Sequence, residues 1–155
     1  MPFFTVTRLA EALNRQGKPL QGARILVLGA AFKKDTDDPR NTPALEVLKA
    51  LRARGAAVSY HDPFIPEVAL DGEPPPARRL REVPLTESTM AAQDCVCLAV
   101  AHSQFDIGWI VKESRHPGGC HGLDVDATGS TRLLNGDQSH VVRLGSGNAP
   151  GNLVC

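Results

Sequence analysis

The sequence predicts one α/β domain: a single doubly wound, mostly parallel, Rossmann-like sheet with flanking helices. Two continuous apolar runs, at 23–29 and 95–101, are typical of strands that are buried on both faces of a parallel sheet. Between the first run and a further strand at 57–60 lies a helical pattern. This strand–helix–strand order predicts a right-handed βαβ unit.

Two helices are predicted from the spacing of apolar residues. Such residues recur at helical intervals over 3–16 and again over 42–54, so each segment should present one apolar face to a core. The second helix is expected to begin at Thr42-Pro43, because the missing N–H of proline costs nothing in a first helical turn. With this helix between them, the first two strands are expected to be parallel neighbours.

The rest of the chain has weaker patterns. The proline run at 74–76 predicts a surface loop within an irregular stretch at 63–85, because proline can occupy neither a helix interior nor a central strand. The remaining expectations are short helices near 87–92 and over 105–113, strands at 122–125 and 141–144, and a loose tail at 145–155.

Composition excludes several classes of partner. The 155 residues fit one domain, and 17 basic residues balance 17 acidic ones. Nucleic-acid binding and membrane-surface binding both favour a basic excess, so neither is expected. No apolar run is long enough to span a membrane, and the N-terminus lacks the pattern of a signal peptide. A cytoplasmic location is therefore expected.

A polar loop at 29–40 follows the first strand and is the most informative stretch of the chain. In open α/β sheets ligands bind at the carboxyl ends of strands, so this loop lies where a ligand is expected. Its basic residues Lys33, Lys34 and Arg40 suit a phosphate or a carboxylate. Only Gly29 fits the glycine pattern of a dinucleotide fingerprint, so an ordinary NAD-binding turn is not predicted.

The residues around this loop follow a specific order: Gly29, Phe32-Lys33, Asp38-Pro39-Arg40, Pro43-Ala44 and then Asp62-Pro63. The order resembles the C-terminal domain of the UDP-glucose/GDP-mannose dehydrogenases, a family of nucleotide-sugar dehydrogenases. The resemblance extends over 1–134, with the family's next core strand and exit loop at 94–102 and Phe105. It implies three parts: an N-terminal helix and linker at 1–20 from the end of the family's central region, a nucleotide-sugar-binding domain at 21–144, and the tail at 145–155.

The resemblance also implies site residues. Phe32 and Lys33 match a pair that contacts the UDP-sugar in the family. Arg40 matches an arginine that reaches NAD bound on another domain. Arg132 is a further substrate-binding candidate, although the family places this arginine two residues after an aspartate and Asp126 lies farther away here.

Each of these residues also has a structural interpretation. Lys33 could be a solvated lysine whose neighbour Phe32 anchors the loop, and Arg40 could brace the three aspartates of the loop. Those aspartates, at 35, 37 and 38, match a calcium loop poorly, because its glycine and distal glutamate are missing.

Two strand ends carry further polar candidates. Asp62 could bind ribose hydroxyls, as an acid at this position does in dinucleotide folds, or it could cap the following turn. His102 could contact a ligand, but a structural hydrogen-bond role is favoured. Cys95 and Cys97 are interpreted as small buried side chains, since a metal or redox pair would need further ligands.

The family oxidises a sugar alcohol carbon to a carboxylate with NAD and a catalytic cysteine from a glycine-rich motif. No cysteine here has that setting, and the neighbours Cys120 and His121 are unsuited to face each other as nucleophile and base. The chain is therefore expected to bind a UDP-sugar without turnover and to bind NAD only weakly by itself. Its start within a family motif favours a fragment or truncated product, with a separate chain carrying the cofactor domain as a candidate partner. The alternatives are a stand-alone nucleotide-binding or assembly module and an independent small α/β enzyme.

Overall fold

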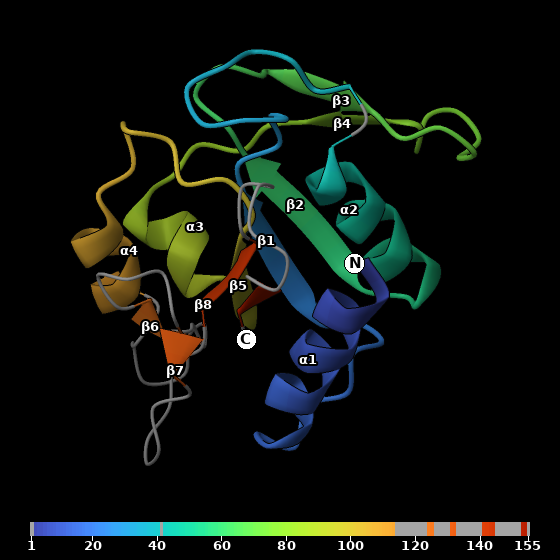
Figure 1. The fold of residues 1–155 in the computed structure, drawn as a ribbon. Helices are drawn as coiled ribbons and strands as arrows, with labels where there is room; N and C mark the ends of the chain where they lie inside the picture. The colour runs from blue at the N-terminus through green and yellow to red at the C-terminus, as the bar shows by residue number, and fades with distance from the viewer. Residues whose placement is uncertain are drawn as a thin grey trace.

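A sheet with the strand order β2-β1-β5-β8-β9 forms the centre of the protein (Figure 1). The computed structural model describes residues 2–40 and 42–113, together with the strand residues 124–125, 131–132, 141–144 and 153–154. The strands of this sheet are β1 (Arg24–Leu28), β2 (Ala57–His61), β5 (Cys95–Leu98), β8 (Val141–Leu144) and β9 (Leu153–Val154).

The sheet is mostly parallel, as the sequence predicts. β1 pairs in parallel with β2 and with β5, so that Ile25 lies beside both Val58 and Cys95, and β5 pairs in parallel with β8. β9 pairs antiparallel with β8. The prediction that the first two strands are parallel neighbours joined by a helix is therefore confirmed.

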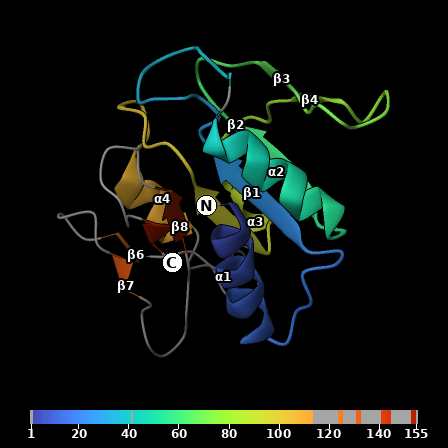
Figure 2. The same cartoon turned by 45° about the vertical axis from the view of Figure 1, so that its right-hand side comes forward.

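Helices cover both faces of the sheet. α1 (Pro2–Asn14) and α2 (Pro43–Ala53) pack together on one side, and α3 (Glu87–Ala91) and α4 (Ile107–Glu113) pack together on the other. Figure 2 shows α1 and α2 side by side after rotation. α2 begins where the sequence predicts: the Thr42 hydroxyl accepts the N–H of Leu45 at 3.2 Å, and Pro43 occupies the first turn.

The core lies between the sheet and the helices of each face. Ile25, Leu26, Val27 and Leu28 of β1 are fully buried, consistent with a central strand that has helices on both sides. The other buried side chains of this core come mainly from α1, α2 and β5, and they include Val6, Leu9, Leu13, Val47, Leu48, Leu51, Val96 and Leu98. The helix of the proposed 1–20 segment therefore shares one core with the α/β domain.

The structure corrects two expectations. The irregular stretch at 63–85 contains an antiparallel pair, β3 (Glu67–Ala69) with β4 (Arg79–Arg81). These strands are too short for an alternation of apolar and polar residues to be recognised beside a proline-rich loop. The segment at 145–155, expected to be a loose tail, includes β9 of the main sheet.

The expected strand at 122–125 also differs from expectation. Its described residues form β6 (Asp124–Val125), which pairs with β7 (Thr131–Arg132) in a separate two-stranded sheet. The helices expected near 87–92 and over 105–113 are present as α3 and α4. Cys120 and His121 lie outside the described residues. Within the described part of the chain, no helix has the length and apolar character needed to cross a membrane.

The strand order sets the position of a ligand site. The chain leaves β1 toward β2 on one side and returns past β1 to β5 on the other, so β1 and β5 flank a topological switch point. The crevice outside the carboxyl ends of the strands at such a point is where doubly wound sheets bind ligands.

Gly29 allows the loop after β1 to pass close to the chain leaving β5. Its φ is +85°, and a Cβ placed there would lie 2.5 Å from the carbonyl oxygen of Val100 and 2.8 Å from the Val100 Cβ. Only glycine combines this left-handed backbone with such a close approach.

We expect Gly29→Ala to lower the free energy of unfolding by about 2–5 kcal/mol, because it adds a steric overlap to the cost of a left-handed alanine. Gly72→Ala is the matched control: φ is +93° there, but no atom lies within 4 Å of the added Cβ, so about 1–2 kcal/mol should be lost. Denaturant unfolding followed by circular dichroism measures both. Equal losses of unfolding free energy in the two variants would mean that the steric overlap with Val100 adds nothing to the effect of Gly29→Ala.

Candidate functional site

The buried carboxylate of Asp62 joins two of the loops at the carboxyl edge of the sheet. Its Oδ2 accepts the backbone N–H groups of Ala30 at 2.7 Å and Ala31 at 3.2 Å, directly after β1. Its Oδ1 accepts the N–H of Phe64 at 2.8 Å, which caps the turn after β2. Asp62 therefore caps its own turn and also holds the neighbouring loop.

His102 brings the loop after β5 into the same set of contacts. We call these contacts of Asp62 with Ala30, Ala31, Phe64 and His102 the Asp62 junction. Its Nε2 lies 2.8 Å from Asp62 Oδ2, and its Nδ1 lies 2.9 Å from the backbone nitrogen of Asp35. A backbone N–H can only donate, so Nδ1 is the acceptor and Nε2 carries the proton that is donated to Asp62. The rings of Phe64 and Phe105 pack against the imidazole, with centroid separations of 5.0 and 5.5 Å.

Asp35 fastens the tip of the loop to the chain after β5. Its carboxylate accepts the N–H of Ser103 at 2.8 Å and the Ser103 hydroxyl at 2.6 Å, and these hydrogen bonds lower the pKa of the Asp35 carboxyl. Its φ of +57° is the one positive value among the described non-glycine residues. A left-handed aspartate costs about 1–2 kcal/mol, so the surrounding contacts hold it against its preference.

Phe32 and Lys33 lie in the loop that this junction holds. Phe32 is 51% exposed, the one exposed large hydrophobic residue among residues of described burial. The backbone N–H of Phe32 donates to the carbonyl of Asp38 at 2.8 Å, and the Thr36 hydroxyl donates to the carbonyl of Lys33 at 2.9 Å, so the loop has internal structure. Both Lys33 and Lys34 are exposed, and neither ammonium forms a hydrogen bond or a salt bridge with another described residue, although the charge of Lys34 helps to lower the pKa of Asp35.

These two side chains have complementary chemistry. An exposed aromatic ring can stack on a planar base, and an unpaired ammonium can bind a phosphate or a sugar oxygen. Their backbone is held by the Asp62 junction and not by the side chains themselves. The loop can therefore present a ring and a charge to a ligand without losing its own supports.

Arg40 is bound to Asp38 in this structure. Its Nε and Nη2 donate to the two carboxylate oxygens at 2.9 and 3.0 Å, and its backbone N–H donates to Oδ1 at 3.0 Å. This contact lowers the pKa of Asp38 to about 2 and raises the pKa of Arg40. The Arg40 side chain is nevertheless 82% exposed, so its outer face remains open to a partner.

Arg132 lies apart from Phe32 and Lys33. It belongs to β7, where it pairs with Asp124 of β6, and both views place this small sheet away from the loop at 29–40 (Figures 1 and 2). The described structure therefore brings together the two matched residues of the loop but not the third substrate-binding candidate.

The junction leaves no ordinary dinucleotide site at the turn after β1. In dinucleotide folds the backbone N–H groups of this turn face a pyrophosphate, and an acid at the end of β2 faces a ribose. Here the N–H groups of Ala30 and Ala31 donate to Asp62, and Asp62 is buried with both oxygens in hydrogen bonds. The residues present do not fit NAD in that manner.

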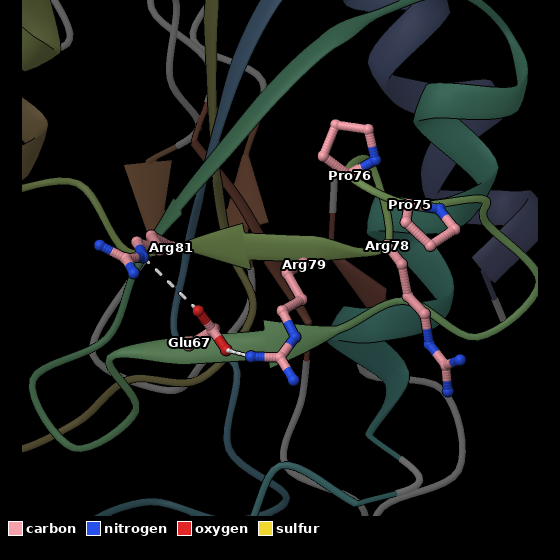
Figure 3. Close-up of a pocket in the computed structure, with 6 residues that line it drawn as sticks. All are labelled: Glu67, Pro75, Pro76, Arg78, Arg79 and Arg81. Atoms are coloured by element: carbon pink, nitrogen blue, oxygen red, sulfur yellow. Dashed lines mark hydrogen bonds and ion pairs between the residues drawn. The ribbon is translucent and has the colours of Figure 1, made fainter.

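Other candidates in the described part of the chain are weaker. No group of three or more His, Cys, Asp or Glu residues is arranged to hold a metal ion within the residues described. Cys95 and Cys97 are buried in β5, as expected of small core side chains. A pocket of about 400 Å³ lies on the β3–β4 pair, lined by Glu67, Pro75, Pro76, Arg78, Arg79 and Arg81 (Figure 3).

Internal ion pairs occupy the arginines of this pocket. Glu67 lies between Arg79 and Arg81 at 3.2 and 3.5 Å, as Figure 3 shows, and Arg78 pairs with Asp71 at 3.0 Å. A bound anion would meet the Glu67 carboxylate as well as the guanidinium groups. The loop at 29–40, whose two lysines are exposed and form no salt bridge with another described residue, is the better candidate for an anion site.

We expect the Asp38–Arg40 contact to be visible in a carboxyl titration. Near about pH 3, Asp38 should be mostly ionised in the parent chain and mostly protonated in Arg40→Ala, where its pKa returns toward 3.8. Because the folded-state pKa is the lower one, any stabilisation from this pair is present above about pH 4 and is lost as pH falls toward 2. Carboxyl ¹³C NMR measures the shift.

Lys34→Ala is the control for this titration, since Lys34 makes no contact with Asp38 and should leave its pKa low. An unchanged Asp38 titration in Arg40→Ala would contradict the contact.

Comparison with known proteins identifies the family. Residues 26–116 match the model of the "UDP-glucose/GDP-mannose dehydrogenase family, UDP binding domain". The UDP-N-acetyl-D-mannosamine dehydrogenase of Pyrococcus horikoshii is 31% identical over 119 residues, which cover 75% of this chain and 25% of that protein. The UDP-N-acetyl-D-glucosamine 6-dehydrogenase of Salmonella typhi is 31% identical over 98 residues, covering 63% and 22%.

A solved structure supports the same relationship. The NDP-N-acetyl-D-galactosaminuronic acid dehydrogenase from Methanosarcina mazei Go1 aligns with a TM-score of 0.56 and 29% identity, over 73% of this chain and 22% of that one. The matched part of the chain spans a quarter or less of the length of the curated relatives it matches. The family-model match covers the β1 loop, β2 and the β5 exit, where the Asp62 junction lies. This chain belongs to the UDP-glucose/GDP-mannose dehydrogenase family and contains its UDP binding domain.

Proposed function

We propose that this domain binds the UDP part of a nucleotide sugar at the loop 29–40, as the nucleotide-sugar-binding part of an NAD-dependent dehydrogenase. The observation that carries the proposal is the exposed Phe32 beside the unpaired Lys33, on a loop that the buried Asp62 holds at the switch point. The match to a UDP binding domain and the UDP-sugar relatives support the choice of ligand.

In this proposal Phe32 and Lys33 divide the recognition between them. The ring supplies apolar contact area to a base or a sugar, while the ammonium binds a phosphate or sugar oxygen. Arg132, on the β6–β7 sheet away from this loop, is kept as a separate candidate contact with the sugar nucleotide. The nucleotide-sugar-binding unit is proposed to extend over 21–144, with α1 as the end of the family's central region.

Arg40 has a different proposed role. It extends outward from Asp38, and we assign it to the NAD that another domain or another chain would hold. Asp38 keeps the guanidinium oriented until that partner arrives, because the bidentate contact fixes the plane of the group.

The 155 residues by themselves are proposed to bind without turnover. The turn after β1 is closed to a dinucleotide by Asp62, and the described cysteines are buried in β5. In this proposal NAD and a catalytic cysteine are supplied by another domain or another chain.

Calorimetric titration with UDP tests the proposal. We expect weak but measurable binding to the parent chain and a loss of tenfold or more in Lys33→Ala, since a charge-assisted hydrogen bond contributes about 1.5–3 kcal/mol. Lys34→Ala is the matched control, because it removes an adjacent exposed lysine of the same loop. Arg40→Ala should also leave UDP affinity nearly unchanged, because its proposed partner is the cofactor.

The pattern across the variants decides the outcome. Equal losses in all three would mean that the loop acts as an undifferentiated basic patch. Absence of binding to the parent chain at millimolar UDP would refute the proposed function.

A further inference from the structure

His102 is enclosed on every side that the structure describes. Its side chain is fully buried, one nitrogen faces Asp62, the other faces the backbone of Asp35, and the rings of Phe64 and Phe105 pack against it. A ring held this way cannot turn without breaking both hydrogen bonds. It is therefore poorly placed to contact a ligand and well placed to control the shape of its surroundings.

The two partners of the ring permit one neutral tautomer. Asp62 Oδ2 already accepts the N–H groups of Ala30 and Ala31, and it accepts the Nε2–H of His102 as a third donor. Nδ1 then offers a lone pair, and the N–H of Asp35 points to it. Asp62 thus selects the tautomer, and the tautomer supplies the acceptor that Asp35 needs.

Asp35 is the residue whose backbone conformation most needs such support. It has a left-handed φ of +57°, and its position lies two residues after Lys33 and three after Phe32. The hydrogen bond to His102 holds its main chain, while Ser103 holds its carboxylate. Release of the main chain would let Asp35 return to a right-handed conformation and move Phe32 and Lys33 with it.

We propose that His102 is a positioning residue for the UDP loop, acting through the Nδ1 lone pair that accepts the Asp35 N–H. This inference rests on the proposed binding of UDP at Phe32 and Lys33. His102 itself does not touch the ligand. Its neutral Nε2–H tautomer sets the backbone on which the ligand contacts depend.

Two substitutions separate the two hydrogen bonds of the ring. In His102→Asn the amide oxygen can occupy the place of Nδ1 and accept the Asp35 N–H, while the contact with Asp62 is lost. In His102→Gln the longer amide can donate to Asp62, while the acceptor for Asp35 is lost. The Asn variant therefore tests whether an acceptor for the Asp35 N–H is enough to hold the loop.

We expect His102→Gln to lose about tenfold in UDP affinity and His102→Asn to stay within about threefold of the parent chain. Amide hydrogen exchange should show the Asp35 N–H protected in the parent chain and in His102→Asn, and unprotected in His102→Gln. Thermal unfolding of both variants shows whether a loss of affinity merely follows a loss of stability.

A measurement on the parent chain needs no variant and no ligand. Long-range ¹H–¹⁵N NMR of His102 near neutral pH should show a pyridine-type Nδ1 and a pyrrole-type Nε2. The opposite tautomer would overturn the inference even if His102→Gln failed to fold.

The outcomes distinguish this inference from the proposed function. A parent chain that binds UDP, with His102→Gln binding equally well, overturns the role of His102 and leaves the UDP site intact. A parent chain with the expected tautomer and a protected Asp35 amide, but no UDP binding, overturns the proposed function and with it the assignment of this loop to UDP.

Discussion

The carboxylate of Asp62 is the constraint on which the carboxyl edge of this sheet depends. It is buried, and it accepts N–H groups from the loop after β1, from the turn after β2, and from His102 after β5. A buried carboxylate is costly unless such donors surround it, and truncating it would leave them unpaired. The three connections are thereby held in one arrangement, although 67 residues separate Asp35 of the first loop from His102 of the last.

This arrangement favours the ligand position that we propose, farther out along the loop. The N–H groups of Ala30 and Ala31 lie in the turn after β1, where a Rossmann fold binds a pyrophosphate, and here both donate to Asp62. What remains for a ligand lies farther along, at the exposed ring of Phe32 and the unpaired ammonium of Lys33. The doubly wound strand order, with its switch point between β1 and β5, is therefore retained. The turn that binds a dinucleotide in other such folds is replaced by the hydrogen bonds of Asp62, which support the loop at 29–40.

Local patterns predicted the elements near the site, because each depends on neighbouring residues. The apolar run of β1 and the Thr42-Pro43 start of α2 are examples. The two interpretations of Asp62 could not be separated, because its partners Ala30 and His102 are distant in sequence. The left-handed Asp35 carries no sequence signal beyond the tolerance of aspartate for that conformation. β3 and β9 were not predicted, because strands of two or three residues form only through pairing with another strand and have little sequence pattern of their own.

Mapping of backbone amide shifts by NMR during a UDP titration tests the central claim most directly. The account predicts that perturbations concentrate in the loop at 29–40 and in the chain after β5 at 99–106, which the Asp62 junction connects. The β3–β4 pair, with its ion-paired arginines, should respond little. Perturbations centred on 67–81, with the loop at 29–40 unaffected, would contradict the account and place the anion site at the arginines.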